Sequence, residues 1–178
     1  MSGSVGDNTA RASGVIASAG GGGKVLQVLE YSTTGTISRN ATSWGAYGSV
    51  EQAITPIAAG SKIKLTLSTG VTGNQNRAFL RFYYDVDGGG YNVCDPVGAA
   101  SGARTNCHFN LKDSQVLPGN ITIFHTPSYS LGNVLTYQVW SWTQNTTYPI
   151  YFGRDWTDSS SAQTPRTQTI FRVEEIGA

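Results

Sequence analysis

The chain has 178 residues, enough for a single domain with a sizeable core, and its 12 basic side chains nearly balance its 11 acidic ones. With only 13% charged residues and no basic excess, the composition argues against a nucleic-acid binder. No apolar run approaches the roughly 18 residues that cross a bilayer, and residues 1–23 lack the pattern of a secretory signal. Glycine, aromatic and β-branched residues are abundant, which predicts an all-β protein with many turns.

Residues 1–22 differ from the rest of the chain. They hold few large apolar side chains and end at a run of glycines, Gly20 to Gly23, a composition typical of a flexible linker. This segment is either a disordered tail or an extended arm that docks on a neighbouring subunit or a larger assembly. The sequence therefore predicts two parts, an anchoring arm over residues 1–22 and a β domain over residues 23–178.

Alternation of polar and apolar residues dominates the β domain; in residues 62–68 it places Ile63, Leu65 and Leu67 on one face. Strands are expected at residues 25–31, 44–54, 62–68, 79–86, 105–111, 121–123, 135–139, 150–152 and 167–176. Turns rich in Gly, Pro and Asn are expected at residues 69–74, 87–90, 117–120 and 130–133. Without a helical period or an internal repeat, this spacing predicts an antiparallel, jelly-roll-like β-sandwich.

Several aromatic side chains lie on the face of their strand opposite the expected core face. They are Phe79 and Tyr83 in one strand, and Trp140 and Trp142 in or just beyond another. One interpretation is a bulge, or a strand that is buried on both faces. The other is a subunit interface or a ligand platform, because Trp and Tyr combine large apolar area with a polar group.

Other aromatic residues lie in or near loops rich in Gly, Ser and Asn. Tyr91, Tyr129 and Trp156 are candidates for contact with a receptor or a glycan, since such loops suit stacking and hydrogen bonding to sugars. Packing within the loops is the alternative for each of them.

The sequence offers little catalytic chemistry. His108 and His125 stand without a recognisable nucleophile motif, and the run Asp85-Val86-Asp87-Gly88 lacks the further ligands of a calcium loop. We therefore expect a protein that is not an enzyme and holds no cofactor or metal. A glycan-cleaving enzyme with Asp85 and Asp87 as its carboxylates is the alternative.

Cys94 and Cys107 flank a segment that resembles a hairpin loop. A disulfide at its base would stabilise the fold by about 3 kcal/mol in the chain-entropy model. The alternative is two reduced, buried thiols; of the two, we expect the disulfide.

Three pieces of the chain resemble β-sandwich virion proteins and tail-fibre tip domains of tailed phages, especially those of marine bacteria and cyanobacteria. They are GKVLQV at residues 23–28, ITP followed by GSKI at residues 54–56 and 60–63, and IFRVEEI at residues 170–176. The resemblance spans residues 23–177. It implies a structural and adhesive virion protein that acts without catalysis, as a homotrimer.

From this resemblance we expect a tail-fibre or knob-type component in the virion, at the tail or a fibre rather than on the head. Its partners would be other virion proteins, held through residues 1–22, and a glycan or protein on the host surface. No nucleic-acid partner and no membrane insertion are expected. Because Met1 opens the sequence without a preceding shaft, a small knob or a particle-surface decoration is favoured. A capsid decoration or head-fibre protein is the first alternative, and a glycan-binding or glycan-cleaving protein is the second.

Overall fold

The computed structural model describes residues 23–73, 77–99, 105–112, 117–157, 159 and 166–178, and in them the chain is all-β. The arm, residues 1–22, lies outside this part. The strands are β1 (Val25–Thr33), β2 (Ile37–Arg39), β3 (Gly45–Ile54), β4 (Lys62–Gly73), β5 (Arg77–Val86), β6 (Asn92–Val93), β7 (Phe109–Lys112), β8 (Leu117–His125), β9 (Leu135–Thr143), β10 (Ile150–Phe152) and β11 (Thr169–Ile176). No helix in the described part is long and apolar enough to span a membrane.

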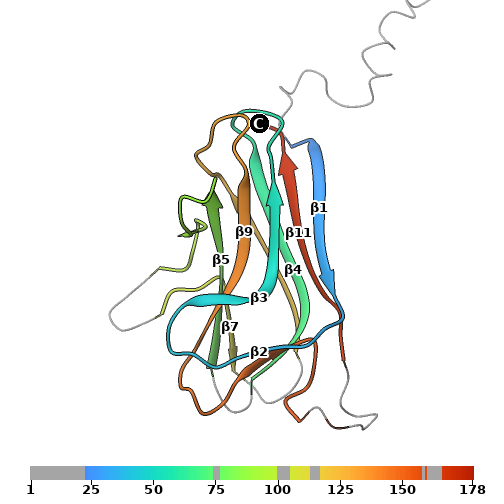
Figure 1. Ribbon diagram of the computed structural model, residues 1–178, viewed down its shortest axis with the longest axis vertical. Helices are drawn as coiled ribbons and strands as arrows, with labels where there is room; N and C mark the ends of the chain where they lie inside the picture. The colour runs from blue at the N-terminus through green and yellow to red at the C-terminus, as the bar shows by residue number, and fades with distance from the viewer. Residues whose placement is uncertain (1–22, 74–76, 100–104, 113–116, 158, 160–165) are drawn as a thin grey trace, which may run out of the picture.

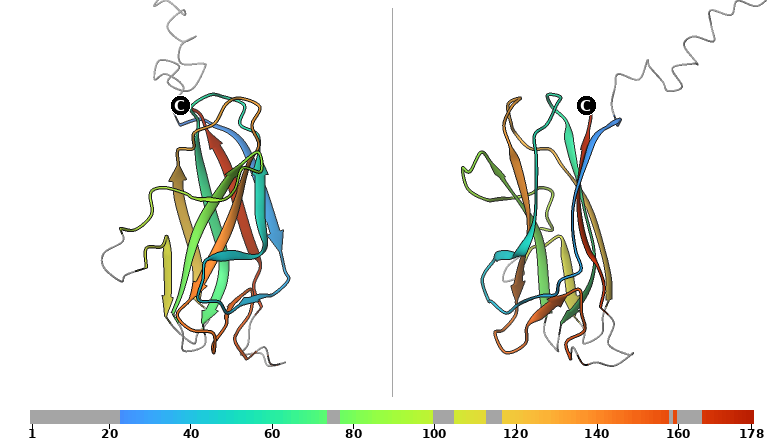
Figure 2. Two further views of the ribbon diagram at one scale, coloured as in Figure 1. Left: turned by 60° about the vertical axis from the view of Figure 1, so that its left-hand side comes forward. Right: turned by 45° about the vertical axis from the view of Figure 1, so that its right-hand side comes forward.

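Two antiparallel sheets face each other, as the two layers of Figure 2 show. Sheet A has the order β1-β11-β4-β10-β2, with β8 paired to the other edge of β4. Sheet B has the order β3-β9-β5-β6, with β7 also paired to β5. The predicted β-sandwich is therefore confirmed.

The core lies between the sheets and follows the alternation in the sequence. In β4, Ile63, Leu65 and Leu67 are fully buried, while Lys62 and Lys64 face away from the core. In β9, every second residue from Leu135 onward is buried. Burying an aliphatic side chain of this size contributes roughly 1.5–3 kcal/mol, so these two strands supply much of the stability of the sandwich.

Two predicted turns are wrong, because the chain continues as strand through both. Residues 69–73 belong to β4 and residues 117–120 belong to β8, and the two segments pair with each other, Gly70 opposite Pro118 and Val71 opposite Leu117. A Cβ on Gly119 would come within 3.3 Å of Val71 Cγ2, so this glycine permits close strand packing rather than a turn. The turns at residues 87–90 and 130–133 are confirmed as turns or bends.

Both ends of the sandwich domain lie at the same end of the molecule (Figure 1). Gly23 N donates to Gly177 O at 2.9 Å, and Gly177 N donates to Lys24 O at 2.8 Å. We call this end, with residues 55–61 and 126–134, the arm end. The opposite end, with β2, β10 and the described residues beyond β10, is called the distal end. Because residues 1–22 join the chain at Gly23, anything they bind is tethered to the arm end.

Candidate functional site

The four predicted interface aromatics form one ladder on the outer face of sheet B. Phe79 pairs with Trp142, and their ring centres are 5.0 Å apart. Tyr83, further along β5, stacks on Trp140 with 4.0 Å between ring centres. We call these four side chains the aromatic ladder. The sequence could only place these four side chains on the outer faces of their strands, and the structure shows that they contact one another in pairs.

The aromatic ladder is partly covered by the protein itself. The ring of Tyr91 lies 5.8 Å from Trp140, and its hydroxyl donates to Glu51 Oε2 at 2.9 Å. Glu51 also accepts from the Gln138 amide, whose Oε1 accepts from Trp140 Nε1 at 2.8 Å. Burial and the hydrogen bond to Glu51 raise the pKa of the Tyr91 phenol, which keeps it a neutral donor. This chain of hydrogen bonds satisfies the polar atoms that lie over the ladder.

A buried arginine, which the sequence analysis did not single out, sits within this face. The guanidinium of Arg81 lies 4.0 Å from the ring centre of Trp44, and its Nε donates to the carbonyl of Asn106 at 2.7 Å. Arg81 is only 9% exposed, and Tyr83 only 7%. Strand β5 is thus packed on both faces. This matches the first interpretation of its outward aromatic residues, a strand that is buried on both faces. Phe79, Trp140 and Trp142 remain half-buried and form the accessible part of the ladder.

The three loop aromatics considered for receptor contact lie in three different places. Tyr91 packs over sheet B, as described. Tyr129 lies at the arm end, where its hydroxyl donates to Ala58 O at 2.6 Å and accepts from Ser61 N at 3.0 Å. Trp156 follows β10 at the distal end and is 41% exposed. Of the three, only Trp156 is exposed; Tyr91 and Tyr129 are half-buried.

Asp85 and Asp87 are engaged in holding loops. Asp85 Oδ2 accepts from Gly88 N at 2.6 Å, and its other oxygen accepts from Gly90 N. Asp87 Oδ1 accepts from Val134 N at 2.8 Å, which ties the two neighbouring loops together. The described residues contain no group of three or more His, Cys, Asp or Glu placed to hold a metal ion. These contacts assign both carboxylates a structural role.

Both histidines are enclosed by the fold. His108 Nδ1 accepts from Phe82 N at 3.1 Å, which leaves Nε2 as donor to Cys94 O at 3.0 Å. His125 Nδ1 lies 3.1 Å from the Tyr137 hydroxyl. Burial lowers the pKa of His108, and it lowers the pKa of His125 to about 4. Both imidazoles are therefore neutral near pH 7.

The predicted disulfide is absent from the structure, where Cys94 and Cys107 are free thiols. The side chain of Cys94 is part of the core, whereas Cys107 is at intermediate exposure. Burial raises the pKa of both thiols, most strongly for Cys94. The pair therefore matches the alternative of reduced thiols.

A buried carboxylate at the arm end also escaped the sequence analysis. Glu175 is fully buried and accepts from Ile57 N and Ala58 N, each at 3.0 Å, and from Ser61 Oγ at 2.8 Å. Gln27 Nε2 donates to it at 2.7 Å. Burial alone would raise the pKa of Glu175, but these hydrogen bonds hold it below its usual value. Glu175 thus joins residues 57–61 to β1 and β11.

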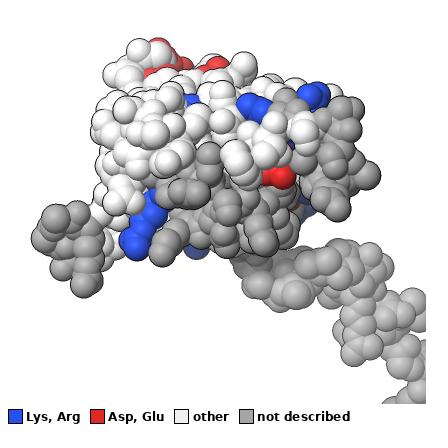
Figure 3. Space-filling model, turned by 90° about the horizontal axis from the view of Figure 1, so that it is seen from below, with Lys and Arg blue, Asp and Glu red and all other residues white. Residues whose placement is uncertain are grey.

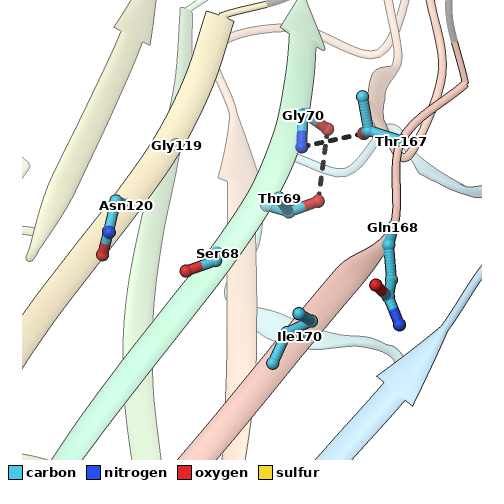
Figure 4. A pocket seen from close by; sticks show the side chains of 8 residues that line it. All are labelled: Ser68, Thr69, Gly70, Gly119, Asn120, Thr167, Gln168 and Ile170. Carbon is cyan, nitrogen blue, oxygen red and sulfur yellow. Dashed lines mark hydrogen bonds between the residues drawn. The ribbon is translucent and has the colours of Figure 1, made fainter.

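A groove of about 460 Å³, lined by uncharged residues, lies on sheet A (Figure 4). It runs between β4, β8 and the start of β11 and is lined by Ser68, Thr69, Gly70, Gly119, Asn120, Thr167, Gln168 and Ile170. Gly70 N donates to Thr167 Oγ1 at 3.0 Å, which fixes one wall. None of these side chains carries a charge, so the groove suits neutral hydrogen-bonding groups such as hydroxyls.

No family model matches the chain, and no curated protein matches it closely enough to show a relationship. The resemblance to phage tail-fibre tips therefore stays a prediction that rests on the sequence motifs alone.

Proposed function

We propose that this chain is a non-enzymatic structural protein of a tailed-phage virion, a knob of tail-fibre type that is anchored through residues 1–22 and contacts the host surface. The observation that supports this most is that the arm joins one end of the sandwich and an exposed aromatic residue lies at the other. The Gly23–Gly177 contact puts the attachment point of the arm at one end, and exposed Trp156 lies at the other. A tethered knob needs this separation, because its free end must reach the target.

The distal end also has a surface suited to an uncharged target. Seen from below in Figure 3, most described atoms of this end belong to residues other than Lys, Arg, Asp and Glu. Exposed Thr146 and Thr147 lie in the connection between β9 and β10 at this end, and exposed Thr157 follows Trp156 in the chain. An exposed indole next to hydroxyl groups fits stacking and hydrogen bonding with sugar rings, which supports a host-surface glycan as the target.

We also infer a jelly-roll connectivity. Without the short β2 and β10, sheet A has the order β1-β11-β4-β8 and sheet B has β3-β9-β5 with β6 and β7 sharing its edge. The chain therefore crosses between the sheets after β1, β3, β4, β7, β8 and β9. This alternation is that of two interlocked Greek keys, the arrangement of jelly rolls in viral capsid and lectin domains.

Location on the particle tests the proposal directly. An antibody raised against the sandwich, residues 23–178, is applied with gold labels to phage particles from the source of the sequence. Label at the tail or its fibres is the expected result. Label over the head would instead support a capsid decoration, and particles without label would overturn the virion assignment.

Contact with the host is tested separately with Trp156→Ser. Fluorescent wild-type chain should bind host cells, and the variant should bind at least tenfold more weakly. The matched control is Leu131→Ser, which removes a side chain that is 60% exposed but lies at the arm end. Equal binding by all three proteins would remove Trp156 from the contact surface.

A further inference from the structure

The outer faces of the two sheets are covered to different extents. Over sheet B, Trp44, Tyr91 and the segment that contains Asn106 pack on the strands. On sheet A, by contrast, β1 and β8 leave large apolar side chains in solvent at the arm end: Val25 is 47% exposed, Val28 49% and Phe124 53%. Among the described residues, nothing packs over this part of sheet A in the way that loops cover sheet B.

An apolar groove of about 750 Å³ lies on this exposed face. It is lined by Gly23, Lys62, Phe124, Ile176, Gly177 and Ala178. Ile176 pairs with Lys62, and Phe124 pairs with Lys64, so that Ile176 and Phe124 stand on opposite sides of β4. With strands about 4.8 Å apart, the groove spans roughly 10 Å from β11 to β8. The alkyl chain of Lys62 contributes apolar surface to its floor.

The groove begins where the arm joins the sandwich, since Gly23 is one of its lining residues. Apart from Met1 at the start of the chain, the large apolar side chains of the arm are Val5, Val15 and Ile16. The stretch from Ile16 to Gly23 spans at most about 25 Å when extended, more than the width of the groove. Its consecutive glycines, Gly20 to Gly23, allow the chain to reverse direction at the rim.

We propose that residues 14–22 fold back into this groove, with Val15 and Ile16 packed on Phe124 and Ile176. The attachment at Gly23 favours this occupant over any free partner, because a tethered segment is present at a high effective concentration. Docking would fix the direction in which residues 1–13 leave the sandwich. Docking of the arm requires only the isolated chain and is independent of any role in a virion.

Hydrogen–deuterium exchange of the full purified chain tests the docking. Peptides that cover residues 14–22 should exchange roughly tenfold more slowly than the same sequence as a free peptide. This protection should be lost in Phe124→Ser and in the double variant Val15→Ser/Ile16→Ser. It should persist in Leu131→Ser, which removes an apolar side chain that is 60% exposed and does not line the groove. Circular dichroism of each variant checks that the β structure is retained.

Three outcomes would overturn the proposal. Exchange of residues 14–22 at the free-peptide rate in the wild type would show that the groove does not hold the arm. Protection that appears only as the protein is concentrated, in parallel with a dimer or trimer in sedimentation, would assign the groove to a neighbouring copy instead. Equal loss of protection in Leu131→Ser would show that the effect of Phe124→Ser is not specific to the groove, and the proposed site would be wrong.

Discussion

The phenol ring of Tyr83 stacks on the indole of Trp140 with 4.0 Å between ring centres, on the side of sheet B that faces away from the main core. Tyr83 is 7% exposed although it points away from that core. The outer face of sheet B is therefore a second, thinner packed layer. Its formation explains why a strand such as β9 can carry two tryptophans on its outer face without exposing both of them fully.

The cost of removing Trp140 tests this second layer. Trp140→Ala should lower the free energy of unfolding by about 2–4 kcal/mol, because the change removes the stack on Tyr83 and leaves Gln138 Oε1 without its donor. Denaturant unfolding followed by circular dichroism measures the difference. Trp156→Ala is the matched control, and its effect should stay within about 0.5 kcal/mol. Equal effects of the two substitutions would contradict the packed layer.

Glu175 should stabilise the fold at neutral pH and lose that effect in acid. In Glu175→Gln, one carboxylate oxygen becomes an NH₂ group, which cannot accept from the donors around it. The substitution should therefore lower the free energy of unfolding by about 1–3 kcal/mol near pH 7. Because the folded pKa lies below the unfolded value, the contribution is present above the unfolded pKa and disappears as the pH falls through the folded pKa.

Unfolding curves at several pH values therefore give a simple readout for Glu175. The gap between wild type and Glu175→Gln should be widest near pH 7 and shrink below about pH 4.5. Glu30→Gln, which only weakens an exposed ion pair with Arg172, is the control and should change stability by less than about 1 kcal/mol. If the difference in free energy of unfolding between the two proteins is the same at all pH values, the fold does not preferentially stabilise the ionised form of Glu175.

His125 should make the fold less stable between pH 6.5 and pH 4. Its folded pKa of about 4 lies below the unfolded value of about 6.5, so the unfolded chain takes up a proton first as the pH falls. The free energy of unfolding should fall by roughly 3 kcal/mol over this window. In His125→Asn, which cannot titrate there, the pH profile should be flatter above pH 5. Titration of the His125 ring by NMR with a pKa near 6.5 would contradict the enclosed, neutral state.

The thiol of Cys94 should be inert in the folded protein. It is fully buried, and burial raises its pKa, so both access and thiolate formation are suppressed. With Ellman's reagent, the denatured chain should release two equivalents of thionitrobenzoate, one for each free thiol. In the folded protein Cys107 should react faster than Cys94, so Cys94→Ser should retain the faster reaction. A denatured wild-type chain that releases none would show that the disulfide forms in solution.

Local alternation in the sequence was enough to place the strands that have one core face. Ile63 in β4 and Leu135 in β9 are buried as the parity predicts, because one side of each strand meets the other sheet. For β5, alternation left open whether the outer face is exposed or buried, and the structure shows that most of it is buried. The residues that cover its outer face, Trp44 and Asn106, are distant in the sequence, and no local pattern records that they return to this strand.

The candidate site was predictable in part for a similar reason. Parity identified the aromatic ladder as a group, since Phe79 and Trp142 keep the register of their strands. It could not show that Tyr91 and Tyr129 are engaged elsewhere, because loop aromatics are positioned by hydrogen bonds to other loops. Glu175 resembled a solvent-exposed acid, since its partners include backbone amides, which leave no signature in a sequence.

The position of Gly23 has a mechanical consequence. Strand β1 pairs with β11 over eight residue pairs, and it begins directly after the point where residues 1–22 are attached. A load between the arm and the distal end acts along the axis of β1. The hydrogen bonds to β11 would then bear the force together in shear, rather than break one at a time as in peeling. The same sandwich held by a central loop would lack this resistance.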